Sequence, residues 1–514
     1  MPDNNTTERL IAEVSPRSIG GVSLFDATMP ITQQNVRQFY SQEPDITVAS
    51  NELRRLGFEI LQEGPVTISI AGSRKLFEDV FSAKLTQKKA MVMAGQESEF
   101  LASDQLLQAP GNLANLIEGI AIAHPAEYFA ESPLPPLAQP EPGAYRYLLV
   151  PDEVGLILNA DRVHRLGATG KGIKVAMIDT GFYRHAFYGW HGYSVQTTVL
   201  GPGATNPDKD DHGHGTGEAA NIFAAAPGIS LIPVKDGGDP TGNFNKAIAQ
   251  GPQVITNSWG YNIDSMTWPQ LQATNPSLYN YLKTLEAAVA NAVAQGIVVC
   301  FSAGNGHRAF PGSHPDVISV GGVHPNYPFL SYDNLEASSY ASSFDSKLYP
   351  GRHVPDLCGL TGRRTAAGTA PLIMLPVQPS ASLDMANTGS TGDGWGIFSG
   401  TSAACPQVAG VVALLLEKKP SLTPAQTKDK LVKSATDVKT GASAMGDVAG
   451  PGADAATGSG LVNAKWAWIN VMAEVAADFF EAPAGRQADM LASGQMPRDI
   501  RKYIEEMVDV LRSR

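Results

Sequence analysis

The chain has 514 residues, of which 43% are hydrophobic, and a formal net charge of −12 at pH 7. This length can bury one large core and carry at least one smaller domain. The acidic balance argues against nucleic acid as a partner, and no apolar run reaches the length of a membrane span.

The first residues and the cysteines bear on the compartment. Residues 1–9 lack a basic region followed by an apolar core, so no secretory signal is visible, and a cytoplasmic location and leaderless export both stay open. Cys300 ends an apolar run and Cys405 lies at an apolar helix, so we expect buried free thiols and a reducing compartment.

Residues 1–130 are expected to form a small α+β domain. We expect residues 1–15, which are polar, to be loose. The hydrophobic pattern then predicts, in chain order, a helical run over 32–40, a helix over 49–56, strands over 58–61 and 66–70, and a helix over 73–81.

A linker over residues 131–145 separates this domain from the rest. The segment from Glu131 to Gly143 is rich in proline, which favours a semi-rigid, exposed connection. Such a segment is easily cut by a protease, but a spacer that stays intact fits the same composition.

A buried strand is predicted over residues 172–179, and it ends in Asp179. Open α/β sheets build their sites at the carboxyl ends of central strands, so this carboxylate is a candidate functional residue. Taken alone, it also fits a helix cap or a ribose ligand.

Two histidines follow at the start of a helix predicted to run to residue 226. His214 directly precedes Gly-Thr and is the preferred general base, whereas His212 is interpreted as a loop residue. A metal site made by both histidines and the acidic run 208–211 is the alternative. No further ligand cluster supports it, so no metal is expected.

Two more strands are predicted over residues 252–260 and 296–306, with an amphipathic helix over 278–295 between them. A right-handed crossover makes such a sheet parallel. Asn305 ends the second strand; Asn-Gly is usually a turn pair, and only its place at a strand end favours a function.

Residues 397–416 carry a serine into an apolar helix. Gly400 permits a tight turn, and Ser402 sits by the unpaired N–H groups of the helix start, where an oxyanion can be held. Ser402 is therefore the candidate nucleophile. A serine cap before a buried helix, with Pro406 in its first turn, is the simpler alternative.

Together, Asp179, His214, Asn305 and Ser402 supply a carboxylate, a base, an amide donor and a nucleophile. Their motifs are Val-Ala-Met-Ile-Asp-Thr-Gly, Gly-His-Gly-Thr-Gly, Ser-Ala-Gly-Asn-Gly and Gly-Thr-Ser-Ala-Ala-Cys-Pro, in the order of the subtilisin-like serine peptidases, which residues 146–468 resemble. The resemblance implies an α/β fold with a mainly parallel sheet and flanking helices, an Asp179–His214–Ser402 triad, and Asn305 in the oxyanion hole. No cofactor is expected, and a structural calcium ion cannot be read from the sequence.

The resemblance also implies that Ser258, Trp259 and Gly260 pair with extended substrate backbone. Trp259 stands where the family often has a smaller aliphatic residue, which predicts a narrowed or aromatic-lined pocket. Gly217 stands where a second histidine is common. The segment 335–395 is longer than usual, and its loops are expected to gate substrate access.

The hydrophobic pattern from Leu53 to Phe81, continued over residues 112–124, resembles the activation prodomain of sedolisin (kumamolisin-like) peptidases. The resemblance implies a ferredoxin-like fold that blocks its own protease. A regulatory or docking domain of similar topology is the alternative. Beyond residue 468, helices are predicted over 471–480 and 498–511; we expect them to pack on the catalytic domain, with oligomerisation or partner docking as the alternative.

The leading hypothesis is therefore a serine endopeptidase that acts on peptides or proteins and is inhibited by its own N-terminal domain. A sedolisin-type acid peptidase is a second hypothesis, but sedolisins replace the histidine by glutamate and carry aspartate at the oxyanion position. A protease-fold binding module is the third; it usually requires a lost triad residue, and His214 and its partners are all present.

Overall fold

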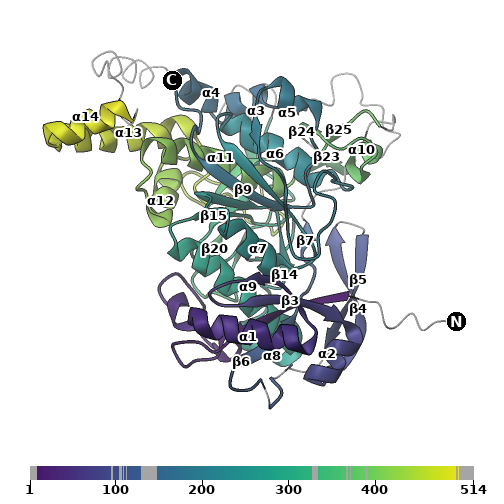
Figure 1. Ribbon diagram of the computed structural model, residues 1–514. Coiled ribbons are helices and arrows are strands. Elements are labelled where there is room, and N and C mark those ends of the chain that lie inside the picture. Colours follow the sequence, from purple (N-terminus) through teal and green to yellow (C-terminus); the bar gives the residue numbers. More distant parts are fainter. Residues whose placement is uncertain are drawn as a thin grey trace.

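The computed structural model (Figure 1) describes a large part of the chain. The described residues are 9–93, 96–103, 107, 109–111, 113–128, 147–326, 334–365, 368–370, 372–387, 392–493 and 496. We call residues 9–128 the N-terminal domain and residues 147–493 the main domain. The linker segment predicted from Glu131 to Gly143 lies outside the described residues.

The main domain is built on a sheet in the order β10-β12-β9-β13-β15-β17-β18, with β11 beside β12 and β21 beside β17. All its pairs are parallel except β17 with β18, so the predicted mainly parallel sheet is confirmed. The strands are β9 (Lys174–Asp179), β10 (Ser194–Val195), β11 (Val199–Leu200), β12 (Ser230–Lys235), β13 (Val254–Asn257), β15 (Val298–Ser302), β17 (Ile318–Pro325), β18 (Leu335–Ala337) and β21 (Leu357–Leu360).

Helices cover both faces of this sheet. Side chains of β9 alternate between them: Val175 and Met177 join the core under α6 (His214–Ala225) and α11 (Thr401–Lys418). Ala176 and Ile178 join the core under α7 (Pro240–Ile248) and α9 (Pro276–Ala294). Burial on both faces explains why these strands read as continuous apolar runs.

The remaining elements of the main domain surround this layer. They are β8 (Leu148–Leu149), α3 (Asp152–Ile157), α4 (Ala160–Arg165), α5 (Ala186–Trp190), β14 (Trp259–Asn262), α8 (Trp268–Thr274), β16 (Ala309–Phe310), β19 (Phe344–Asp345), β20 (His353–Val354), β22 (Arg363–Thr365), β23 (Gly368–Ala370), β24 (Ile373–Pro376), α10 (Ser382–Asn387), β25 (Trp395–Ile397), α12 (Pro424–Ser434), α13 (Ala464–Glu481) and α14 (Ala484–Ala492).

The N-terminal domain has the ferredoxin-like element order β1-α1-β2-β3-α2-β6, and its sheet runs β2-β3-β1-β6 with every pair antiparallel. The elements are β1 (Arg9–Pro16), α1 (Glu43–Leu56), β2 (Glu59–Glu63), β3 (Ile68–Ser73), α2 (Arg74–Phe81) and β6 (Ile117–Ile122). Gly57 ends α1 with φ 104°, and the Ser73 side chain caps α2. The predicted α+β, ferredoxin-like domain is thus present.

Two expectations for this domain were wrong. Residues 9–16 are not loose but form β1, an inner strand with Ala12 and Val14 fully buried. The apolar residues of this strand form only a short pattern directly after a polar N-terminal segment, so the sequence did not indicate a strand here. The helical run expected over 32–40 is a single 3-10 turn, η3 (Val36–Phe39).

The N-terminal domain contacts the main domain in two places. Its sheet and residues 24–41 lie on α7 and α9; here Leu24, Ile31, Val36 and Phe39 pack with Ala287 and Ala290 of α9. Separately, β7 (Glu127–Tyr128) enters a sheet in the order β16-β14-β7-β4-β5, which mixes strands of both domains. Figure 1 shows the hairpin of β4 (Leu85–Met93) and β5 (Gln96–Ser103) beside β7.

At the other end of the chain, α13 packs on α4, α11 and α12, and its Trp468, Val471 and Met472 belong to the main core. The expected packing of a C-terminal helix on this domain is seen, although the boundary drawn after residue 468 falls inside α13. The helix predicted over 498–511 lies outside the described residues. Cys300, Cys358 and Cys405 are buried free thiols. None of the described helices has the length and apolar character that crossing a membrane requires.

Candidate active site

The candidate site lies where four parallel strands end. Asp179 ends β9, Asp236 follows β12, Ser258 follows β13, and Asn305 follows β15. Because these strands run in the same direction, their carboxyl ends meet at one edge of the sheet. Helices α6 and α11, which pack on each other, bring His214 and Ser402 to this edge.

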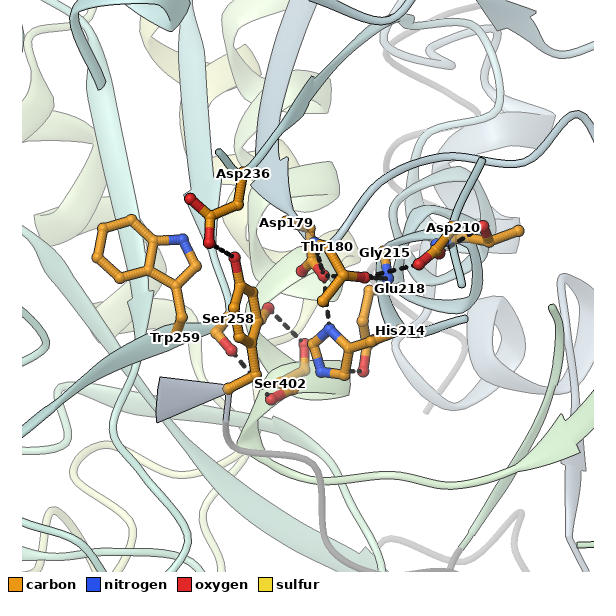
Figure 2. A network of polar contacts seen from close by, with 12 residues as sticks. Asp179, Thr180, Asp210, His214, Gly215, Glu218, Asp236, Ser258, Trp259 and Ser402 are labelled. Carbon is orange, nitrogen blue, oxygen red and sulfur yellow. Dashed lines mark hydrogen bonds and ion pairs between the residues drawn. The ribbon is translucent and has the colours of Figure 1, made fainter. Parts of the chain in front are cut away.

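Asp179 and His214 form a buried pair, and Figure 2 shows the His214 ring between Asp179 and Ser402. The distance from His214 Nδ1 to Asp179 Oδ1 is 2.7 Å, and both side chains are almost fully buried. The Thr180 N–H also donates to Asp179 Oδ1, at 2.8 Å. A carboxylate acceptor at Nδ1 puts the ring proton there and makes Nε2 the proton-accepting nitrogen.

A second carboxylate, Asp210, fixes the start of α6. Its Oδ1 accepts from Thr180 Oγ1 at 2.8 Å and from the Gly213 N–H at 2.9 Å. Its Oδ2 accepts from the N–H and the hydroxyl of Thr216, at 2.8 and 2.6 Å. Asp210 therefore ties the end of β9 to the first turn that carries His214. In the sequence it stood out only as part of an acidic run.

Two glycines in this turn make room for the site. A Cβ on Gly215 would lie 2.3 Å from the carbonyl oxygen of Gly181, so no larger residue fits there. A Cβ on Gly217 would lie 2.4 Å from the ring of Phe398, whose ring stacks at 6.2 Å from that of His214. Phe398 thus fills the space next to the position at which the family often has a second histidine.

Glu218, one turn along α6, is a buried carboxyl group that the sequence did not single out. Its Oε1 lies 3.7 Å from His214 Nε2, and its Oε2 accepts from Asn221 at 2.9 Å. Burial raises the pKa of Glu218 to about 8. Burial disfavours a charged His214, but Asp179, Glu218 and Asp210 more than offset this and raise the pKa of the imidazole to about 9. The site thus stabilises the imidazolium that forms when His214 takes up a proton, and the neutral ring that can accept one prevails only at pH values above this pKa.

Ser402 lies in the first turn of α11, beside Ser258. Ser402 Oγ donates to the Ser258 carbonyl at 3.3 Å, and Ser258 Oγ donates to the Ser402 carbonyl at 2.9 Å. The Ser258 side chain therefore supports the helix that carries Ser402. The N-terminus of α11 directs unpaired N–H groups and the positive end of the helix dipole at this place.

Asn305, in the loop after β15, lies beside the N-terminus of α11, and its carboxamide is held in one orientation. Its Oδ1 accepts from both the N–H and the hydroxyl of Thr401, each at 2.9 Å. Thr401 in turn accepts from the Gly304 N–H at 3.2 Å. With the oxygen turned toward Thr401, the Nδ2 donor is directed the other way, as an oxyanion hole requires.

Trp259 differs from its expectation. Its side chain is 1% exposed, its indole N–H donates to the carbonyl of Ile178 at 3.0 Å, and its ring contacts Phe244 and Phe301. The prediction of an aromatic-lined substrate pocket at Trp259 is therefore wrong, because the indole fills the core behind the cleft. That core accommodates the tryptophan at a position where the family often has a smaller aliphatic residue.

The backbone of this segment is nevertheless paired with an extended chain. Strand β7 runs antiparallel to β14, with Tyr128 opposite Trp259 and Glu127 opposite Gly260. The Tyr128 ring lies edge-on to the His214 ring at 5.8 Å, and its hydroxyl donates to Asp236 at 2.9 Å. Tyr128 and Asp236 could not be identified from the sequence, because only the fold brings together residues so distant along the chain.

His212 takes no part in this arrangement. Its ring centroid is 6.0 Å from that of His214, and burial lowers its pKa to about 4. Within the described part of the chain, no group of three or more histidine, cysteine, aspartate and glutamate side chains is placed to hold a metal ion. The segment 335–395, whose loops are expected to gate substrate access, contains the short strands β18 to β24 and helix α10 among its described residues.

Comparison with known proteins identifies the family of this chain. The model of the subtilase family (Peptidase_S8) matches residues 170–460, more than half of the chain. Alkaline elastase YaB of Bacillus sp. (strain YaB) is 29% identical over 311 residues, which is 58% of this chain and 65% of the elastase. Subtilisin Savinase of Lederbergia lenta is 28% identical over 320 residues, covering 60% of this chain and 95% of Savinase.

A solved structure supports the fold. Fervidolysin from Fervidobacterium pennivorans, a keratinolytic enzyme related to subtilisin, matches with a TM-score of 0.52 and 18% identity. The match covers 91% of this chain and 62% of fervidolysin. With the family match over more than half of its length, the chain belongs to the subtilase family.

Proposed function

We propose that this chain hydrolyses peptide bonds in peptide or protein substrates, with Ser402 as nucleophile, His214 as general base and Asp179 as its orienting carboxylate. The observation that carries the proposal is the buried Asp179–His214 pair, with Nε2 as the accepting nitrogen, next to Ser402 at the start of α11. A buried base beside a helix-borne hydroxyl suits acyl transfer.

In the proposed mechanism, the Ser402 proton passes to His214 Nε2 while Ser402 Oγ attacks the substrate carbonyl. The Asn305 amide and the Ser402 N–H stabilise the oxyanion; one such donor is worth about 2.7 to 4 kcal/mol. His214 then gives its proton to the leaving amine, and the C–N bond breaks. Water, deprotonated by His214, releases the acyl group and restores the Ser402 hydroxyl.

We further propose that the N-terminal domain inhibits this activity. Strand β7 occupies β14 beside Ser258, the backbone that an extended substrate would use, and Tyr128 covers His214. The attachment of β7 to the same chain gives it an effective concentration on the order of millimolar, so a weak intrinsic affinity would keep the cleft closed. Cleavage in or near the segment from Glu131 to Gly143 would remove that advantage.

Labelling with a fluorophosphonate probe tests the chemistry. Wild-type protein that has been cut in the linker should react at Ser402 and cleave peptides, and Ser402→Ala should lose both, with peptide turnover lower by about 10⁶-fold. His214→Ala should also lose activity, whereas His212→Ala should keep most of it. Retained turnover in Ser402→Ala, or equal losses in the two histidine variants, would contradict the assignment.

A further inference from the structure

Asp236 is a carboxylate at the edge of the cleft to which the proposed mechanism gives no role. It directly follows β12, and its N–H donates to the carbonyl of Asp179 at 2.8 Å, so its backbone is fixed to the site. The Tyr128 hydroxyl donates to Asp236 Oδ2 at 2.9 Å, and the Tyr128 ring lies 5.8 Å from that of His214.

The two oxygens of Asp236 are used differently. Oδ1 accepts from the Gly238 N–H at 2.8 Å and from the Asn243 amide at 2.5 Å. These donors belong to the main domain and hold the carboxylate in place. Oδ2 is then turned to the cleft, where its partner is the Tyr128 hydroxyl. The main domain therefore presents a prearranged acceptor to whatever chain lies along β14.

The register of β7 identifies the substrate position that faces this acceptor. Glu127 is opposite Gly260 and Tyr128 is opposite Trp259, so the next residue of a chain bound in this register falls opposite Ser258. The Ser258 carbonyl accepts from Ser402 Oγ, so that next residue offers its carbonyl to the nucleophile. A substrate residue in the place of Tyr128 is thus the second one before the scissile bond.

The surroundings of the Tyr128 side chain favour a phenol over other groups. Burial, with Asp236 and Asp179 nearby, raises the pKa of Tyr128, so its hydroxyl remains a donor. The ring is edge-on to His214, which becomes a cation during catalysis. A lysine or arginine side chain at this position would be repelled by this cation.

We propose that Asp236 is a specificity-determining residue that selects substrates with tyrosine as the second residue before the scissile bond. This inference rests on the proposed function, because it takes β7 as a guide to how a substrate binds. A hydrogen bond to a charged acceptor should favour tyrosine over phenylalanine by about 10- to 100-fold in kcat/KM. The partly buried position of Asp236 lets water replace a missing hydroxyl, which limits the discrimination.

The test uses the full chain and peptides that differ only at this position, which carries tyrosine, phenylalanine, lysine or alanine. They compete in one tube, since a ratio of kcat/KM values does not depend on how much of the enzyme the N-terminal domain blocks. Wild type should prefer tyrosine to phenylalanine by the stated factor, and Asp236→Ala should cleave the two equally. Asp208→Ala, which removes the same charge from a side chain that is 72% exposed, should keep the preference.

Three results would overturn the inference while leaving the peptidase assignment intact. They are equal cleavage of the tyrosine and phenylalanine peptides by wild type, an unchanged preference in Asp236→Ala, and faster cleavage of the lysine peptide than of the tyrosine peptide. If no peptide is cut and no fluorophosphonate reacts, the proposed function itself fails. The contact is then judged by a double-mutant cycle of Tyr128→Phe and Asp236→Ala in Ser402→Ala protein, read as amide exchange in β7. If the two substitutions together change the protection of the β7 amides by about tenfold less than the product of their separate effects, the Tyr128–Asp236 contact is selective. If their effects are simply additive in free energy, the contact is not selective.

Discussion

The two contacts of the N-terminal domain differ in kind. The cleft contact, formed by β7 and β14, consists of main-chain pairing, the Tyr128 side chain, and a contact between Glu127 and His307 at 3.3 Å. The face contact, formed by the β2-β3-β1-β6 sheet and residues 24–41 on α7 and α9, consists of side chains. There Tyr40 donates to Asn291 at 2.6 Å, and Tyr279 donates to the Ala27 carbonyl at 3.0 Å.

The two contacts should therefore have different roles: the cleft contact blocks the site, and the face contact provides the docking affinity. Main-chain pairing along β14 is available to any extended peptide, so the cleft contact blocks the site without being specific to this domain. The face contact buries apolar side chains that fit only one partner, and it should provide most of the docking free energy. The initial rate of peptide hydrolysis by the uncut chain reports on both contacts.

The largest expected effect comes from the apolar part of the face contact. Phe39 is 2% exposed and packs in the cluster shared with α9. Truncating a buried phenylalanine costs about 3 to 5 kcal/mol, so Phe39→Ala should raise the initial rate by about 100-fold or more until the cleft is fully open. Phe480→Ala is the matched control, since Phe480 is 61% exposed on α13. An unchanged rate in Phe39→Ala would place the affinity elsewhere.

A buried carboxyl pair should make the face contact sensitive to pH. Glu13 of β1 and Asp239 at the start of α7 are fully buried. Among the described residues, no donor group forms a hydrogen bond with Glu13 Oε2 or Asp239 Oδ2. Burial, and then the Asp239 charge, raise the pKa of Glu13 well above 4.5. One shared proton satisfies both oxygens, so docking is strongest while that proton is held.

The sign of the pH effect follows from this raised pKa. Docking should weaken as pH rises above 4.5, by up to about tenfold per pH unit, until the docked pair has lost its proton. The initial rate of wild type should therefore rise more steeply with pH than that of Glu13→Gln, which keeps a neutral side chain. Glu59→Gln, at a side chain that is 62% exposed, should behave as wild type. Parallel profiles for wild type and Glu13→Gln would refute the pair's role.

Glu218 in the cleft can be compared with the Glu13–Asp239 pair of the face contact. Its buried carboxyl should affect turnover and leave docking unchanged. Its charge helps to raise the pKa of His214, and a charged His214 cannot accept the Ser402 proton. Glu218→Gln should lower that pKa and move the acid limb of kcat/KM to lower pH by about 1 unit. Measured on linker-cut enzyme, an acid limb that stays in place or moves to higher pH would exclude this influence.

The smallest effects compare two tyrosines, one in each contact. Tyr40→Phe removes a hydrogen bond to a neutral amide, and Tyr128→Phe removes one to a carboxylate. Since bonds to charged groups are stronger, we expect initial rates to rise by about threefold and about tenfold, respectively. Equal or reversed ratios would show that these side chains add nothing to docking beyond packing.

Much of the site could be predicted because its residues stand in local motifs. Asp179 ends a strand, Asn305 lies just after one, and His214 and Ser402 lie at the starts of helices; the hydrophobic pattern already reveals these elements. Such positions are fixed by the parallel sheet, which brings the carboxyl ends of its strands to one edge. The sequence therefore sufficed to collect them before any distance was known.

The partners of these residues could not be predicted, because they are set by contacts between distant segments. Tyr128 and Asp236 meet only when β7 joins β14, and Glu218 differs from any helix glutamate only through its burial beside His214. The direction of the Trp259 side chain depends on core space offered by Phe244 and Phe301. β1 escaped notice since its burial comes from strands more than fifty residues later.

Peptide hydrolysis by the full chain, followed together with its intact mass, shows whether the N-terminal domain closes a serine peptidase. We expect a slow initial rate that accelerates as the chain is cut in or near the segment from Glu131 to Gly143, while Ser402→Ala stays intact and inactive. A wild-type chain that remains uncut and hydrolyses peptides at its full rate from the start would contradict it.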